Sequence, residues 1–568
     1  MEYSYKMLEP TQQFNSLNLE HLEEQFTPTS DDLKHGYNPF QLNSFQYYQP
    51  VLKLLFDITQ QNYNSIQLNH RYHINDLTTV IDTTTHEVLE KPIFIKYSPL
   101  LDPIRYMIGR YETESTDIRT LPTLDGAKFV KLADTNNASY VDGFFCLLSS
   151  KLMEVHDFKH SIDYYGSFSA VQKKFKMNIA DDYEYLNSSN FFLDNLNKFF
   201  RISKGRVSSI SNHNSRGNRN KLVISSEDDV ITDVAQIDLA VPELELSALE
   251  EVYVQVKEKD EREDKSDSES DDEDEDDASD DDDSEDDEDI SESDEDDDED
   301  ISESDDEEWE EEEEEEEEDK EEPAIFAYVD NFPVQMICLE KCDGTLDELF
   351  VKDEINEDTG ASALFQVIMT MLAYQTAYKF THNDLHTNNI MYVSTTEEFL
   401  YYKYNGICYK VPTYGRIFKI IDFGRSIYTY KGKIFCSDSF APGGDAATQY
   451  NFEPYYNNKH PVIEPNYSFD LCRLGCSIHD FIIGDKPRDE LQKTIHRWCL
   501  DDKKASVLYK KNGEERYPDF KLYKMIAKTV HAHTPQNQLA FPFFSQFKTQ
   551  QVPSGASCMD IGSIPSYA

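Results

Sequence analysis

The chain has 568 residues, with 111 acidic and 53 basic side chains, so its formal net charge is −58. The charge is concentrated, because the block Glu258–Glu322 holds 48 acidic residues against four basic ones, and the other 503 residues carry only −14. That remainder is rich in Tyr and Phe and long enough to bury a large core. These numbers exclude a globally disordered chain and a nucleic-acid binder that works by bulk positive charge.

Cysteine use and hydropathy narrow the class of protein further. None of the nine cysteines falls in a CxxC pair, which disfavours a zinc site and indicates reduced thiols in an intracellular compartment. No apolar run approaches the roughly 20 residues that span a bilayer, and the first residues lack the apolar stretch of a signal peptide. We expect no membrane contact and no direct contact with nucleic acid.

In the part of the chain before the acidic block, strand-like and helix-like patterns alternate. In chain order they predict a helix at Tyr47–Thr59, a hairpin and strand between Leu77 and Tyr97, a helix at Asn137–Glu154, a strand at Ser161–Phe168, a helix at Ile179–Phe200, a loop at Arg201–Lys221, and strands at Leu222–Ile224 and Val252–Val256.

After the acidic block the apolar segments become longer. The patterns predict a buried strand at Pro333–Leu339, a helix at Ala361–Phe380, strands at Ile390–Val393 and Ile417–Ile421, helices from Phe469 to about His533, and a tail without periodicity after Phe543.

Two short motifs carry the chemistry. THNDLHTNNIMYV places Asp384 and Asn389 five residues apart after a long apolar helix, and KIIDFGR places Asp422 just after a buried strand. Phosphoryl transfer needs one carboxylate to meet the attacking hydroxyl, and a second carboxylate and an amide oxygen to hold Mg²⁺ on the nucleotide phosphates. H-x-D-x-x-x-x-N followed by apolar-apolar-D-F-G is specific as a pair.

The two motifs are similar to those of protein kinases, in the divergent group found in nucleocytoplasmic large DNA viruses such as the mimivirus-like giants. The resemblance covers roughly residues 77–530, interrupted by the acidic block, and its specific motifs lie between residues 381 and 475. It implies an α+β, two-lobed protein-kinase-like fold with a long disordered acidic insertion in the N-lobe. It further implies ATP and Mg²⁺ as cofactors, Ser/Thr side chains of viral or host proteins as acceptors, and a location in the host cytoplasm or the virion.

The resemblance also implies roles for individual residues. Asp384 takes the part of the catalytic-loop aspartate, Asn389 and Asp422 hold the metal, and Asp470 in SFDLCRLG braces the catalytic loop. Lys96 in IFIKY matches the phosphate-pairing lysine of the third strand, although a solvent-facing strand lysine is the alternative.

Further positions are assigned by their place in the expected kinase fold. The acidic partner of Lys96 is expected on the following helix, where Glu154 is the candidate and Asp142 the competitor. Backbone groups between Glu340 and Asp343, with Glu340 and Cys342 as the chosen positions, are expected to meet adenine.

Two departures from the kinase pattern affect these expectations. No G-x-G-x-x-G precedes Lys96, and the hairpin tip DTTTH has no glycine, so ATP should bind more weakly or in another way. In the catalytic loop, Asn383 stands where kinases usually carry Arg, and His386 stands where Ser/Thr kinases carry Lys. His386 is either a phosphate-facing catalytic donor or a packed loop histidine, and the substrate class stays open.

The expected organisation follows from the resemblance and the charge map. It comprises an N-terminal extension (1–70), an N-lobe with inserted segments (71–257), the acidic insertion (258–322), the end of the N-lobe and the hinge (323–343), the C-lobe (344–535) and a C-terminal tail (536–568). The acidic insertion is either a solvated surface loop or a decoy for basic, histone-like proteins. An active kinase is the leading hypothesis; the alternatives are a pseudokinase scaffold, which the missing glycine loop favours, and an acidic chaperone-like binding protein.

Overall fold

The computed structural model describes residues 17–61, 63, 68–111, 117–206, 323–484, 486–518 and 520–568. The acidic block Glu258–Glu322 and the strands expected at Leu222–Ile224 and Val252–Val256 lie outside these residues. The chain divides into one unit made of Met1–Arg219 and Asp319–Ala568 and a second made of Asn220–Glu318, and the description below concerns the first.

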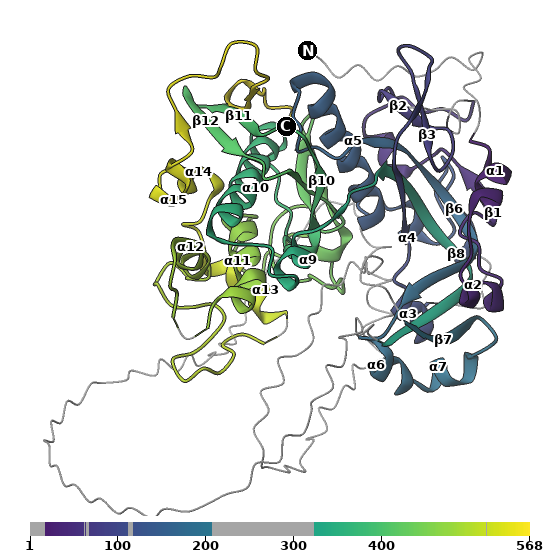
Figure 1. Ribbon diagram of the computed structural model, residues 1–568. Coiled ribbons are helices and arrows are strands. Elements are labelled where there is room, and N and C mark those ends of the chain that lie inside the picture. Colours follow the sequence, from purple (N-terminus) through teal and green to yellow (C-terminus); the bar gives the residue numbers. More distant parts are fainter. Residues whose placement is uncertain are drawn as a thin grey trace, which may run out of the picture. The chain divides into compact units, whose positions relative to one another are not determined.

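The largest sheet has five strands, all antiparallel to their neighbours: β1 (Leu42–Gln46), β5 (Ile93–Pro99), β6 (Tyr164–Asn178), β7 (Phe200–Arg206) and β8 (Pro323–Glu340). The long strand β8 organises the sheet. It pairs with β6 along most of its length, with β7 along its first half and with β5 along its second half (Figure 1). The second half of β8 is buried from Phe332 to Leu339 and is apolar there except at Gln335, as expected for a central strand that is covered on both faces.

Within the described residues, four smaller sheets accompany the large one. They are β2 (Tyr72–Ile74), β3 (Thr79–Asp82) and β4 (Val88–Glu90); β9 (Gly344–Thr345), β10 (Ile390–Ser394) and β13 (Arg416–Ile420); β11 (Phe399–Tyr404), β12 (Ile407–Pro412), β16 (Lys548–Thr549) and β17 (Met559–Asp560); and β14 (Ile427–Tyr430) with β15 (Lys433–Cys436).

Helices dominate the chain after β9, so the protein is of the α+β class. The α-helices are α1 (Leu19–Gln25), α2 (Ser30–His35), α3 (Pro103–Met107), α4 (Val130–Ala133), α5 (Ala138–His156), α6 (Tyr183–Asn187), α7 (Asn190–Asn195), α9 (Leu346–Val351), α10 (Glu357–Tyr378), α11 (Phe469–Ile482), α12 (Glu490–Trp498), α13 (Lys521–Thr529), α14 (Pro535–Gln538) and α15 (Pro542–Ser545). Short 3₁₀ turns lie at η1 (Pro50–Leu54), η2 (Asp117–Arg119), η4 (Thr387–Asn389), η5 (Asp438–Phe440) and η6 (Ile561–Ser563).

Helices α5 and α10 form the centre of the core. Both are buried along most of their length, which fits their apolar composition all round rather than on one stripe. Phe145 of α5 stacks on Phe380, which follows α10, with ring centroids 4.3 Å apart, and it contacts Phe423 at 4.6 Å. Phe380, which precedes the first motif, and Phe423, which lies in the second, therefore pack in one aromatic cluster. Neither of these helices, nor any other in the described residues, is long and apolar enough to cross a membrane.

The expected elements around the motifs are confirmed, including the helices that became α5 and α10 and the strands β8, β10 and β13. Three expectations elsewhere are wrong. The helix expected at Tyr47–Thr59 is reduced to the turn η1, which starts at Pro50, and the one at Ile179–Phe200 is split into α6 and α7 by the cap residue Ser189. The loop expected from Arg201 begins as strand β7. The tail after Phe543, for which no element was predicted, forms the short strands β16 and β17.

The strands that the sequence patterns missed share a physical cause. Strand β7 is polar, and its backbone pairing with β8, a segment far along the chain, decides its conformation. Strands β16 and β17 pair with the hairpin of β12 and β11, which the sequence patterns did not predict. The N-terminal extension likewise joins the main sheet, because β1 pairs with β6.

Candidate active site

The first turn of α11 holds the loop that carries Asp384 by hydrogen bonds. Asp470 is fully buried, and its two carboxylate oxygens accept hydrogen bonds from the backbone N–H groups of His382 (2.9 Å) and Asn383 (2.8 Å). Asn383 adopts a left-handed φ of 63°, a conformation that Asn tolerates better than most residues. Its side chain donates to the carbonyl of Arg425 (3.1 Å) and accepts from Tyr450 (2.7 Å), so it fixes the loop by neutral hydrogen bonds.

The two motif loops are joined to each other. Antiparallel pairing of β10 with β13 sets Ile390 opposite Ile420, and the backbone N–H of Ile421 donates to the carbonyl of Asn389 at 3.0 Å. The Asn389 side-chain amide donates to the carbonyl of Asp384 (2.9 Å). As a result, Asp384 and Asp422 belong to one hydrogen-bonded unit.

Lys96 links three elements by ion pairs. Its Nζ lies 2.7 Å from Asp142 Oδ2 on α5 and 2.8 Å from Asp422 Oδ1, while the other oxygen of Asp142 accepts from the backbone N–H of Phe423 at 2.9 Å. Burial by itself would raise the pKa of Asp422, but the Lys96 ammonium lowers it to about 2. Asp422 also has a left-handed φ of 62°, and such backbone strain clusters at functional sites.

The expected pairing of Lys96 with Glu154 is not formed, and its competitor Asp142 takes that place. Glu154 lies in the last turn of α5, 12 residues after Asp142, which corresponds to about 18 Å along a helix. There its carboxylate accepts from Lys151 Nζ (2.6 Å) and from the backbone N–H of Arg71 (2.7 Å). The start of α5, rather than its end, faces β5, the strand that carries Lys96.

The carboxylate of Asp384 is surrounded by donors that the sequence analysis did not identify. Oδ1 accepts from the hydroxyl of Tyr523 on α13 (2.8 Å), which in turn accepts from Arg473 Nε (2.8 Å), and Oδ2 lies 3.8 Å from Arg425 Nη1. Burial would raise the pKa of Asp384, but these cations and the Tyr523 hydrogen bond outweigh it and hold the pKa below its ordinary value. Asp384 is therefore an ionised, oriented acceptor.

His386 lies in the interior of the same loop. Its side chain is buried, its Nε2 is 3.1 Å from the Asn389 amide nitrogen, and burial lowers its pKa to about 4. The ring is therefore neutral at ordinary pH and takes the role of the packed loop histidine. It supplies no positive charge to a phosphate.

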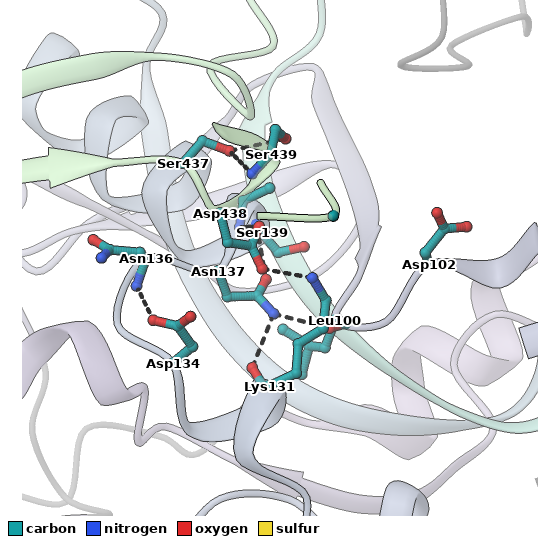
Figure 2. Close-up of polar contacts among 12 residues, drawn as sticks. Leu100, Asp102, Lys131, Asp134, Asn136, Asn137, Ser139, Ser437, Asp438 and Ser439 are labelled. Atoms are coloured by element: carbon teal, nitrogen blue, oxygen red, sulfur yellow. Dashed lines mark hydrogen bonds and ion pairs between the residues drawn. The ribbon is translucent and has the colours of Figure 1, made fainter. Parts of the chain in front are cut away.

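The N-terminus of α5 is held by residues from the chain segment after β15, as Figure 2 shows. Asp438 accepts from the backbone N–H of Ala138 (3.0 Å) and pairs with Lys131 Nζ (2.6 Å), and its own N–H donates to the carbonyl of Asn136 (2.7 Å). A carboxylate at a helix N-terminus is favoured by the helix dipole. Asp438 thus fixes the first turn of the helix that carries Asp142.

These groups open onto one cavity of about 620 Å³. Its lining includes Lys96, Asp384, Asp422, Arg425, Ser139 and Asp438. Asn389 and His386 do not line it and lie behind Asp384 in the loop. The cavity lies between β5, which carries Lys96, and the two motif loops. Its size suits a small-molecule ligand.

The two expected hinge residues lie at the end of β8 and do not line this cavity. The Glu340 carboxylate pairs with Lys419 Nζ (2.7 Å), and its backbone N–H donates to the carbonyl of Asp163 (3.0 Å). Cys342 is half-buried, and burial raises its pKa to about 12. The structure therefore places both residues beside the sheet of β9, β10 and β13. Glu340 is paired there with Lys419 of β13, a partner that the sequence did not indicate.

The expected hairpin before Lys96 is present but belongs to a different sheet. Strand β3 pairs with both β2 and β4, whereas β5 pairs with β8. Within the described residues, β5 is consequently an edge strand, and no strand covers its outer side. The glycine-free tip DTTTH is not joined to the lysine strand in the way that the sequence led us to expect.

Comparisons with known proteins add little about function. No protein-family model matches the chain. The chain is 30% identical over 177 residues to the uncharacterized protein 098R of Invertebrate iridescent virus 6, a stretch that makes up 30% of this chain. It spans about a quarter (26%) of the length of that viral protein.

Proposed function

We propose that the chain is an ATP- and Mg²⁺-dependent kinase with a two-lobed protein-kinase-like fold, which transfers the γ-phosphoryl group of ATP to a hydroxyl. Ser and Thr side chains of proteins are the favoured acceptors because of the motif resemblance. One observation carries the proposal. Lys96 is ion-paired with both Asp142 and Asp422, and it shares a cavity with the oriented carboxylate of Asp384.

In this proposal the roles divide among the two motif loops and the lysine strand. Lys96 orients the α- and β-phosphates, and Asp142 keeps the ammonium in place. Asp384 accepts the proton of the attacking hydroxyl, which suits a carboxylate that is ionised and fixed by Tyr523. Phosphoryl transfer needs positioned groups and electrostatic stabilisation rather than covalent catalysis, and the hydrogen-bonded unit described above would supply both.

Asp422, which lines the cavity, is the proposed protein ligand of Mg²⁺, which when bound would neutralise charge on the phosphates; Asn389, the second ligand that the sequence predicts, does not line the cavity. Magnesium in nucleotide sites usually takes one or two protein carboxylates and completes its shell with phosphates and water. The described residues contain no group of three or more His, Cys, Asp and Glu side chains placed to hold a metal alone, so the phosphates would have to complete the site. The low pKa of Asp422 keeps this ligand ionised.

A pseudokinase that binds nucleotide without turnover is the second candidate, and one observation favours it. In kinases, a glycine-rich loop on neighbouring strands covers the phosphates. Here β5 is the edge of its sheet within the described residues, and the β3–β4 hairpin pairs elsewhere. Such a site should hold the phosphates less tightly.

Two measurements on three proteins test the proposal. Wild type, Asp384→Asn and Asp422→Ala are compared for transfer of radiolabelled γ-phosphate to a mixed protein acceptor, and for the thermal shift that Mg-ATP causes. A kinase requires transfer by wild type only, with the thermal shift kept in Asp384→Asn and lost in Asp422→Ala. A thermal shift without transfer in wild type would identify the pseudokinase, and the absence of both would overturn the proposal.

A further inference from the structure

The catalytic loop lacks a positively charged side chain that could face the transferred phosphoryl group. His386 occupies the position at which Ser/Thr kinases carry a lysine, but it is buried and packed on Asn389. The charge that develops on the phosphoryl oxygens during transfer still has to be stabilised. A cation from another part of the cavity is needed if the protein transfers phosphate.

Five basic side chains line the cavity, and four of them are committed to partners. Arg105 pairs with its neighbour Asp102 and donates to the carbonyl of Gly443. The three lysines are held by carboxylates at short distances: Lys96 by Asp142 and Asp422 (2.7 and 2.8 Å), Lys131 by Asp438 (2.6 Å) and Lys176 by Asp32 (2.7 Å). The fifth, Arg425, is held more loosely.

Arg425 directly follows the Asp422-Phe423-Gly424 motif, and its nearest carboxylate is the proposed base itself. Its Nη1 lies 3.8 Å from Asp384 Oδ2, at the long end of the ion-pair range, and its guanidinium lies 5.9 Å from the ring centroid of Tyr523. Its backbone is fixed, because its carbonyl accepts from the Asn383 side chain (3.1 Å). About a fifth of the side chain (19%) remains exposed.

This geometry would let the Arg425 guanidinium move a short distance from Asp384 to a bound phosphoryl group. The backbone of Arg425 is fixed, its side chain lines the same cavity as Asp384 and Asp422, and its guanidinium makes no ion pair shorter than 3.8 Å. A phosphoryl oxygen placed between Asp384 and the metal ligand Asp422 would offer it a stronger, charge-assisted bond, and guanidinium groups match phosphate geometry well.

We propose that Arg425 is a further catalytic residue, which binds the γ-phosphoryl group during transfer in place of the missing catalytic-loop lysine. The inference rests on the proposed kinase function. In the step, a bond forms between the acceptor oxygen and phosphorus, and the bond from phosphorus to the oxygen that bridges to ADP breaks. The proton of the acceptor goes to Asp384, the electron pair leaves with ADP, and Arg425 stays protonated throughout.

The alternative is that Arg425 acts only by orienting Asp384. The two roles separate in an Asp384→Asn background, in which transfer is slowed by about 10²–10⁴-fold and the carboxylate is gone. If Arg425 contacts the γ-phosphate, Arg425→Gln in this background weakens binding of Mg-ATP by roughly tenfold and leaves binding of Mg-ADP unchanged. If Arg425 only orients Asp384, the ratio of the two affinities does not change, and the proposal is overturned.

Isothermal titration of the full chain with Mg-ATP and Mg-ADP gives both affinities. Arg425→Lys, which keeps the charge without the forked geometry, should retain part of the ATP preference and serves if Arg425→Gln does not fold. Arg488→Gln, a change at an exposed arginine outside the cavity, is the matched control and should leave the ratio unchanged. If the Asp384→Asn protein binds neither nucleotide, the proposed function fails; if it binds both and Arg425 has no effect, only the Arg425 inference fails.

Discussion

The two sides of the Lys96 cavity differ in how firmly they are built. On the side of the motif loops, Asp470, Asn383 and Asn389 hold the backbone by hydrogen bonds of 2.8–3.1 Å, so that Asp384 and Asp422 have fixed positions. On the other side, β5 ends its sheet within the described residues. In the proposed kinase, such a site would position the reacting groups accurately but enclose the nucleotide only in part. We therefore expect phosphoryl transfer to be combined with modest affinity for the nucleotide.

The largest effect on the transfer rate should come from a change on the side of the motif loops. Asp384→Asn removes the proton acceptor and should lower the transfer rate by about 10²–10⁴-fold, the usual contribution of general-base catalysis. Nucleotide affinity should change little, because the carboxylate faces the acceptor. Single-turnover kinetics with labelled ATP measure the rate. A variant that transfers phosphate at the wild-type rate would show that the loop is not catalytic.

Asp142→Asn should be the next most damaging change. Removing one partner of a buried ion pair typically costs about 3–5 kcal/mol of the free energy of unfolding, and the remaining pair with Asp422 should keep the loss near the lower end. Transfer should fall as Lys96 loses its position. Urea unfolding and the transfer assay measure the two effects.

Glu154→Gln is the matched control for Asp142→Asn, because it is an acid-to-amide change on the same helix, away from Lys96. We expect wild-type transfer from it. If Glu154→Gln impaired transfer and Asp142→Asn did not, the observed pairing of Lys96 would be irrelevant to function.

Tyr523→Phe should have a smaller effect, visible mainly in the pH dependence. The Tyr523 hydroxyl is one of the donors that lower the pKa of Asp384, so its removal should raise that pKa. Since the base must be ionised, the acid limb of the rate profile should move to higher pH, with activity recovered above it. Because the pKa of Asp384 in the wild type lies below its ordinary value of 3.8, rates measured from about pH 2.5 to 7 test this. A uniform loss at every pH would indicate a structural role alone.

The hairpin tip should matter least among these side chains. Thr84→Ala with Thr85→Ala changes two exposed residues whose strands pair away from β5. The KM for ATP should stay within about twofold of wild type, as is usual for surface substitutions. A large rise in KM would mean that the tip covers the phosphates, and the contrast between the two sides of the cavity would disappear.

Excision of the acidic segment tests whether the unit that holds the cavity stands alone. Arg206 and Pro323 are opposite each other in the pairing of β7 with β8, so residues 207–322 can be replaced by a short hairpin turn. Long loops cost little closure free energy, about 0.6 kcal/mol for each doubling of length. The melting temperature and the transfer rate should therefore remain close to those of the full chain. Unfolding of the shortened chain would place part of the core in the excised residues.

The sequence predicted the parts of the site that depend on short-range order. Asp384, Asn389 and Asp422 follow an apolar helix and a buried strand with clear periodicity, so their local placement could be inferred from the residue pattern alone. The partner of Lys96 could not be decided in the same way. Two carboxylates, Asp142 and Glu154, occur along α5, and which of them faces the lysine depends on how the helix packs against β5.

The remaining parts come from contacts between distant segments. Tyr523 and Arg473 reach Asp384 from α13 and α11, and Asp438 reaches α5 across about 300 residues of chain. Spacing within a motif carries no information about such neighbours. The composition of KIIDFGR and SFDLCRLG did contain Arg425 and Arg473, and a search for cations to balance the motif carboxylates would have singled them out.

The contact between Asp438 and the start of α5 couples the chain segment after β15 thermodynamically to the Lys96 cavity. Asp438 favours the helix position in which Asp142 meets Lys96, so a ligand that favours that position must stabilise the Asp438 contact by the same free energy. Occupancy of the cavity should thus be reported at a distance, as slower amide hydrogen exchange at Ala138 and Asp438.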